Sequence, residues 1–208
     1  EIAEKMGDVF DYSGDIPVSS AQLRVYTAQS MSPGSTTYNV PYAFKTDCVD
    51  KERLPSAIDK LILRHEILRT HFENKNGQII QVIEENAQCK VETLVSEDIT
   101  DFIRPFDLSV TPLIRVGCTQ NMVVIDMHHI ITDGASMPVF MRELNEFYMG
   151  RELTNKVVPY KQFAARIPDN TESEAYWLSV FKDEIPVLEM NTDFRPEQKQ
   201  SFSGDALY

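Results

Sequence analysis

Cysteine is scarce in this chain. Only three occur among its 208 residues, Cys48, Cys89 and Cys118. They are odd in number, far apart and outside any CxxC pattern, so the sequence indicates neither a disulfide framework nor a cysteine-based zinc site. We therefore interpret them as buried thiols.

Basic residues are fewer than acidic ones, and long apolar runs are absent from the sequence. Lysine and arginine number 20 against 32 acidic residues, which gives a net charge of -12. Nucleic acids and anionic membranes are bound by clustered Lys and Arg, so both are poor partners for such a chain. No apolar stretch approaches the ~20 residues that cross a bilayer, and the opening EIAEKMGDVF has neither the basic nor the apolar region of a signal peptide. We expect a cytoplasmic protein.

The chain is rich enough in hydrophobic residues to fold. They make up 42% of it, which suffices for one substantial core or two small ones. Capping boxes and helical apolar spacing predict helices at about 19–29, 50–68, 136–150 and 171–184. Strand patterns predict an edge strand at 38–45, a strand at 89–94 and two hairpins at 70–84 and 112–129. This mixed order of strands and helices favours an α/β sandwich.

Two adjacent histidines, His128 and His129, close the apolar run of the second hairpin. Successive side chains on a strand point to opposite faces, so the pair cannot easily converge on one metal ion, and the sequence is not HExxH. One histidine should face the core and the other a surface or cleft. The pair alone favours packing over acid/base chemistry, and Asp133 before a predicted helix by itself indicates an N-cap.

Three segments of the sequence make acid/base chemistry more plausible than the histidine pair alone does. IPVSSAQLRVY (16–26), RHEILRTHF (64–72) and MHHIITDGAS (127–136) resemble, in this order, the opening motifs of condensation domains from nonribosomal peptide synthetases. The resemblance begins at about residue 15 and extends through FIRPFDLSVTPLIRV to SEAYWLSVFKDEIPVLEMNTDFRP. It implies a chloramphenicol acetyltransferase-like α/β sandwich, in which two lobes form a V with the active site at their junction.

The resemblance also implies a domain organisation. Residues 1–14 would be a linker or tail from a preceding carrier domain, and residues 15–208 the N-terminal lobe of a condensation domain whose C-terminal lobe is absent. One motif departs from the family pattern. Where the family has YxDFAxW, this chain has YKQFAAR, with Gln162 in place of the acid and Arg166 in place of the aromatic residue.

The implied activity is amide formation. The amine of an acceptor aminoacyl thioester attacks a donor acyl thioester, and both substrates are carried on phosphopantetheine. A thioester is already activated, so the chemistry needs neither a GxSxG nucleophile nor a metal, and no cofactor bound by this lobe is expected. The implied partners are upstream and downstream carrier proteins, the C-terminal lobe and an adjacent adenylation domain.

The family motif HHxxxDG falls on His128, His129, Asp133 and Gly134. His129 matches the histidine with the active-site role, and we expect it to act either as general base or as a positioner of the amine and the tetrahedral intermediate. His128 would support the site. Gly134 would supply permissive backbone geometry or a close approach to substrate.

Asp133 has two possible roles. It could hold its loop through an ion pair with an arginine such as Arg64 or Arg69, or with one from the C-terminal lobe. Alternatively, it could cap the helix that follows. The sequence does not choose between these roles.

Three alternative functions remain open. The DGAS that follows HHIIT favours an L-donor subtype over an epimerisation domain. A noncatalytic lobe that docks carrier proteins would bind them equally well after His129→Ala. A free-standing CoA-dependent acyltransferase of the same superfold would need only HxxxD, and the SxAQxR and RHExLRT matches disfavour it.

Overall fold

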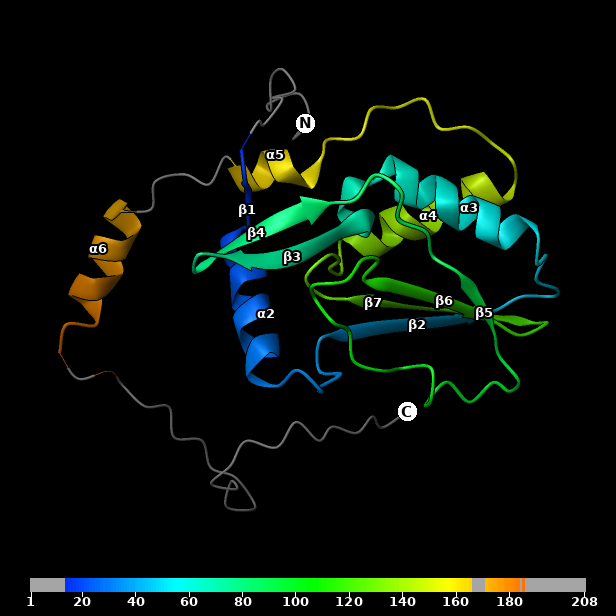
Figure 1. The fold of residues 1–208 in the computed structure, drawn as a ribbon, viewed down its shortest axis with the longest axis horizontal. Helices are drawn as coiled ribbons and strands as arrows, with labels where there is room; N and C mark the ends of the chain where they lie inside the picture. Colours follow the sequence, from blue (N-terminus) through cyan, green and yellow to red (C-terminus); the bar gives the residue numbers. More distant parts are fainter. Residues whose placement is uncertain (1–13, 166–170, 184, 186–208) are drawn as a thin grey trace, which may run out of the picture. The chain divides into compact units, whose positions relative to one another are not determined.

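The computed structural model describes residues 14–165, 171–183 and 185 (Figure 1). The predicted tail at 1–14 lies almost entirely outside this part of the chain, as does the stretch after 185. The chain divides into one unit up to Ile167 and a second from Pro168 onward, and each is described by itself.

A four-stranded sheet in the order β2-β7-β6-β5 forms the centre of the first unit (Figure 1). Its strands are β2 (Asn39–Lys45), β5 (Val91–Thr93), β6 (Ile114–Cys118) and β7 (Met122–His128). β6 and β7 form the predicted antiparallel hairpin, and β2 lies at the edge, where Pro41 removes no central ladder hydrogen bond. Every residue of β7 is buried, which is why its sequence is apolar almost throughout.

Two helices, α3 (Arg53–Arg64) and α4 (Ser136–Tyr148), pack together over one face of this sheet (Figure 1). Helix α3 is shorter than the helix predicted at 50–68. The last turn of that predicted helix is instead the 3-10 helix η1 (Glu66–Arg69). The core between these layers is formed by residues at helical and alternating spacing: Leu54, Ile58, Leu61, Ile62, Val123, Ile125, Met127, Phe140, Leu144 and Phe147. Each such side chain contributes about 1.5–3 kcal/mol when fully buried.

The second sheet has the order β1-β4-β3 and carries the predicted hairpin. Its strands are β1 (Ile16–Pro17), β3 (Thr70–Lys75) and β4 (Gln78–Ile83). Asn76 and Gly77 form the turn with φ values of 55° and 87°, so the left-handed geometry predicted for the glycine extends to its neighbour.

Helix α2 (Ser20–Met31) begins at the predicted capping box. Ser19 caps the amide of Gln22, and the Gln22 side chain accepts the amide of Ser19 in return. The short helix α5 (Tyr160–Ala165) is joined to this cap by a 2.9 Å hydrogen bond between the hydroxyls of Tyr160 and Ser19. Gln162, at the departure from the family motif, is buried, whereas Arg166 lies outside the described residues.

Helix α6 (Thr171–Val180) lies in the second unit, among its described residues 171–183 and 185. It confirms the last predicted helix. None of the helices in the described ranges is both long and apolar enough to cross a bilayer.

The cysteine prediction is right for two of the three residues. Cys89 and Cys118 are buried, but Cys48 is exposed. Burial raises the pKa of Cys89 to about 11, which keeps it a thiol at neutral pH.

Candidate active site

The two adjacent histidines lie where β7 ends, and they face different environments as predicted. His128 is the last residue of the strand and is completely buried. His129 is the first residue beyond it and is exposed, while its backbone amide still donates to the carbonyl of Tyr38 at 2.7 Å. The strand therefore carries His129 to the surface and fixes its backbone.

The buried histidine has a packing role. Its ring meets Phe106 edge-on at 6.0 Å and Tyr38 at 6.1 Å between centroids. Nδ1 accepts the amide of Ile130 at 3.2 Å, so the proton of the neutral ring is on Nε2, which faces the side-chain oxygen of Gln29 at 3.4 Å. Burial, reinforced by the charge of His129, lowers the pKa of His128 to about 4. His128 is neutral at physiological pH.

The exposed histidine has a defined tautomer. Its Nδ1 lies 2.7 Å from the carbonyl oxygen of Thr132. A carbonyl can only accept a hydrogen bond, so Nδ1 carries the proton and Nε2 keeps its lone pair when the ring is neutral. The ring lines a cavity of about 210 Å³ together with Gln22, Ile67 and Tyr160. Nε2 is thus available as a hydrogen-bond acceptor or base.

Asp133 acts as a helix cap in this structure. Its Oδ1 accepts the amide of Ser136 at 2.8 Å and the hydroxyl of the same residue at 2.6 Å. The Ser136 hydroxyl is the main reason that the pKa of Asp133 is below its ordinary value. These contacts close the turn between Thr132 and α4, so the carboxylate orders the backbone that positions His129.

The arginines proposed for Asp133 bind elsewhere. Arg64 Nε donates to Glu143 at 2.9 Å, and Arg69 donates to the carbonyl of Glu84 at 2.7 Å. The expected pairing of Arg64 or Arg69 with Asp133 is therefore wrong for the described part of the chain. Capping, the alternative role, is the one observed.

Arg64 instead fastens α3 to α4. Glu143 is only 3% exposed and accepts hydrogen bonds from Arg64 and from Nε2 of His65 at 2.6 Å. Burial raises the pKa of Glu143, but its two partners together outweigh burial and bring the pKa below its ordinary value. A buried carboxylate held in this way fixes the two helices against each other. A supporting role of Arg64 for the site stays a prediction.

Gly134 has no unusual backbone. Its φ lies outside the left-handed region, so the expected requirement for permissive geometry is wrong here. A Cβ added to Gly134 would meet no atom within 4 Å. The other expectation, a close approach to substrate, stays a prediction.

Two buried glutamines of α2 were not predicted as site residues. Gln22 Nε2 approaches the carbonyl of Ile130 at 3.4 Å and Gln81 Oε1 at 3.2 Å, while Gln29 faces His128. They contact residues on both sides of His129. Their spacing of seven residues on one helix is the only sequence signal that could have grouped them.

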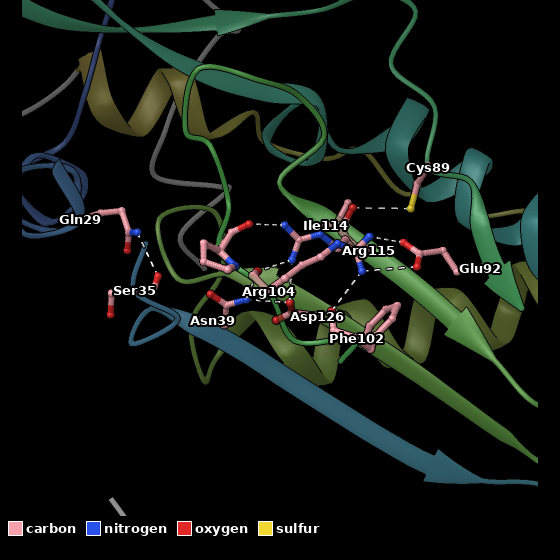
Figure 2. Close-up of polar contacts among 11 residues, drawn as sticks. Gln29, Ser35, Asn39, Cys89, Glu92, Phe102, Arg104, Ile114, Arg115 and Asp126 are labelled. Carbon is pink, nitrogen blue, oxygen red and sulfur yellow. Dashed lines mark hydrogen bonds and ion pairs between the residues drawn. The ribbon is translucent and has the colours of Figure 1, made fainter. Parts of the chain in front are cut away.

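A buried ion pair was also not predicted from the sequence. It lies on the face of the central sheet opposite α3 and α4. Arg115 Nη1 donates to Asp126 at 3.1 Å, and Asn39 donates to the same carboxylate oxygen at 2.7 Å (Figure 2). Arg115 also lies 3.6 Å from the Phe106 ring centroid, the ring that packs on His128. Cross-strand pairing of β6 with β7 brings Arg115 opposite Asp126, which a register prediction could have found.

No group of three His, Cys, Asp or Glu side chains in the described residues is placed to hold a metal ion. The site consists of an imidazole with a free Nε2, an open cavity and backbone held by buried partners.

Comparison with known proteins identifies the relatives of this chain. A family model described as a condensation domain matches residues 12–208. Surfactin synthase subunit 2 of Bacillus subtilis (strain 168) is 37% identical over 211 residues, which cover 94% of this chain and 6% of that protein. Gramicidin S synthase 2 of Aneurinibacillus migulanus is 37% identical over 209 residues, which cover 92% of this chain and 5% of that protein. The chain therefore spans a small part of these relatives.

Solved structures share the fold. The starter condensation domain of rhizomide synthetase RzmA matches with a TM-score of 0.70 and 20% identity, over 83% of this chain and 49% of that chain. The X-domain from teicoplanin biosynthesis matches with a TM-score of 0.66 and 21% identity, over 86% of this chain and 42% of that chain. The expected chloramphenicol acetyltransferase-like α/β fold is confirmed.

The buried state of His128 predicts a pH dependence of stability. The unfolded chain takes up a proton near pH 6.5, but the folded chain resists protonation down to about pH 4. Stability should therefore be unaffected by this group above pH 6.5 and fall as the pH drops toward 4, by up to about 3 kcal/mol. Denaturant unfolding of the wild type and of His128→Gln at several pH values measures this, because the variant lacks the titrating group. Parallel curves for the two proteins would contradict the assignment.

Proposed function

Because this chain belongs to the condensation-domain family of nonribosomal peptide synthetases, we propose that it is the N-terminal lobe of a domain that forms amide bonds between carrier-bound substrates. The observation that carries the proposal is the hydrogen bond from His129 Nδ1 to Thr132, which leaves Nε2 free on a ring that lines a cavity. The amine of the acceptor aminoacyl thioester would place its hydrogen on this nitrogen.

The reaction needs one proton transfer. The acceptor nitrogen attacks the carbonyl carbon of the donor thioester, the carbonyl electrons move onto oxygen, and Nε2 of His129 takes a proton from the nitrogen. The tetrahedral intermediate then collapses, the amide carbonyl re-forms and the donor thiolate leaves. The thioester supplies the driving force, so the protein has to hold two substrates together and accept the proton.

A positioning role uses the same geometry. Nε2 could accept a hydrogen bond from the amine and orient it without taking the proton. In both cases, Nε2 has to be unprotonated, and the hydrogen bond from Nδ1 to the Thr132 carbonyl favours the tautomer of the neutral ring in which it is.

The proposal includes the partners of the lobe. Upstream and downstream carrier proteins would bring the two substrates on phosphopantetheine, a C-terminal lobe would close the cavity, and an adenylation domain would be adjacent. Residues 1–14 would link the lobe to a preceding carrier domain, residues 15–208 would form the lobe itself, and the cytoplasm is the proposed location. Relatives far longer than this chain support a place within a multidomain synthetase.

Replacement of the exposed histidine tests the proposal. In the complete domain with loaded carrier proteins, His129→Ala should lower the rate of amide formation by about 10²–10⁴-fold, because general base catalysis typically contributes that much. Carrier binding should stay within about twofold of wild type, since the residue is exposed and anchored only by local bonds. Turnover and carrier affinity are measured on the same preparations. Unchanged turnover would favour a docking lobe, and equal losses in both would indicate misfolding.

A second prediction concerns this chain alone. The 208-residue chain should give little or no condensation, because one lobe cannot hold the donor and the acceptor at the same time. The product is measured with both carrier proteins loaded, and the complete domain serves as the positive control. Turnover by the chain alone would refute the two-lobe account.

A further inference from the structure

A separate cavity lies at the end of β7 opposite to His129. It measures about 190 Å³ and is lined by residues of β2, α3, β7 and α4 and of the segment between β2 and α3. Val123, near the start of β7, lines it and is five residues, about 17 Å of extended chain, from His128. Among the described residues, none lines both this cavity and the one that contains His129.

The floor of this cavity is apolar and buried. Val49, Leu54, Val123 and Leu144 are each at most 6% exposed and belong to the main core. A water molecule on this floor finds no side chain with which to form a hydrogen bond, whereas a hydrocarbon ring in its place removes apolar surface from water. The floor therefore favours an apolar group.

Three uncharged polar side chains, those of Thr46, Asn145 and Tyr148, form the rim of the cavity. Thr46 and Asn145 are exposed, and their hydroxyl and carboxamide groups have no hydrogen-bond partner within the described part of the chain. The Tyr148 oxygen accepts the amide of Asp50 at 2.9 Å and keeps its own hydrogen to donate. The rim therefore offers hydrogen bonds to a ligand whose apolar part lies on the floor.

The walls of the cavity are held in place by the protein itself. The segment after β2 is fastened to the turn between β6 and β7, because the amides of Thr46 and Val49 donate to the carbonyls of Asn121 at 2.9 Å and Gln120 at 2.8 Å. Another wall is part of the continuous helix α4. Binding therefore requires little ordering of the protein, which favours affinity for a small ligand.

The size and the charge of the cavity restrict the ligand. A cavity of about 150 Å³ with an apolar lining holds one benzene molecule, so 190 Å³ suffices for one substituted six-membered ring. None of the described lining residues is charged, so an ionic group would lose its hydration there without an opposite charge to replace it. The Phe44 ring and the Met141 thioether line the cavity and offer contacts that suit an aromatic ring.

We propose that this cavity is a binding site for a small, uncharged aromatic molecule that carries one hydrogen-bonding group, such as a phenol. The ring lies on the apolar floor, and the hydrogen-bonding group points to the rim. The inference does not rest on the proposed function of His129, because the two cavities have separate linings.

Titration of the folded chain with phenol tests the inference. Methyl resonances in ¹H–¹³C spectra report on Val49, Leu54, Val123 and Leu144, and their shifts should saturate with a Kd on the order of 1 mM or below. Benzene should bind about 2–10-fold more weakly, because it makes no hydrogen bond with the rim. Benzoate is charged at neutral pH and should give no saturable shift of these methyl resonances.

A blocked rim provides the matched pair of variants. Asn145→Phe adds a ring to the cavity from an exposed position and should weaken phenol binding about tenfold or more. Asn86 is exposed and lines none of the described cavities, so Asn86→Phe should leave the Kd within about twofold of wild type. Thermal unfolding checks that both variants are folded, and the titration of the wild type decides the inference even if one of them is not.

The possible results are distinct. Saturable shifts at the floor methyl groups, tighter binding of phenol than of benzene, and weaker binding in Asn145→Phe alone support the inference. An absence of saturable shifts in the wild type overturns it, and so do shifts at Ile67, Ile130 and Ile131 of the His129 cavity instead. Benzoate binding as tight as that of phenol also overturns it. None of these results depends on amide formation, so a failure of the proposed function leaves the inference unaffected.

Discussion

The hydrogen bond from His129 to the Thr132 carbonyl is the contact on which the candidate site depends. It requires the chain to leave β7 directly after His128 and to turn within four residues. Two hydrogen bonds hold that turn: the buried His128 accepts the amide of Ile130, and the exposed Asp133 accepts the amide of Ser136 at the start of α4. An exposed ring is thereby kept in one tautomer, with the lone pair of the neutral ring on Nε2.

Adjacent histidines have different properties here because a strand alternates its faces. Burial makes His128 a neutral packing residue with a pKa of about 4, whereas His129 emerges beside a cavity. The end of β7 alone would not fix the orientation of the His129 ring. Helix α4 supplies the missing constraint through the Asp133 cap, and the buried Glu143 joins that helix to α3.

Much of this arrangement can be predicted from local sequence. The capping box at Ser19, the turn at Asn76-Gly77 and the opposite faces of the two histidines follow from short-range rules, and the structure has them all. Ion pairs across the fold cannot be predicted in this way. Arg64 has a long side chain and many acidic candidates, and only the packing of α3 on α4 selects Glu143 over Asp133.

The tautomer of His129 is the most direct test of the account. It can be measured from the ¹⁵N chemical shifts of the two ring nitrogens in the folded chain, at a pH where the ring is neutral. The account predicts a protonated Nδ1 and an unprotonated Nε2, as the contact with Thr132 requires. A proton on Nε2 instead would contradict it, because the nitrogen proposed to receive the amine proton would already carry one.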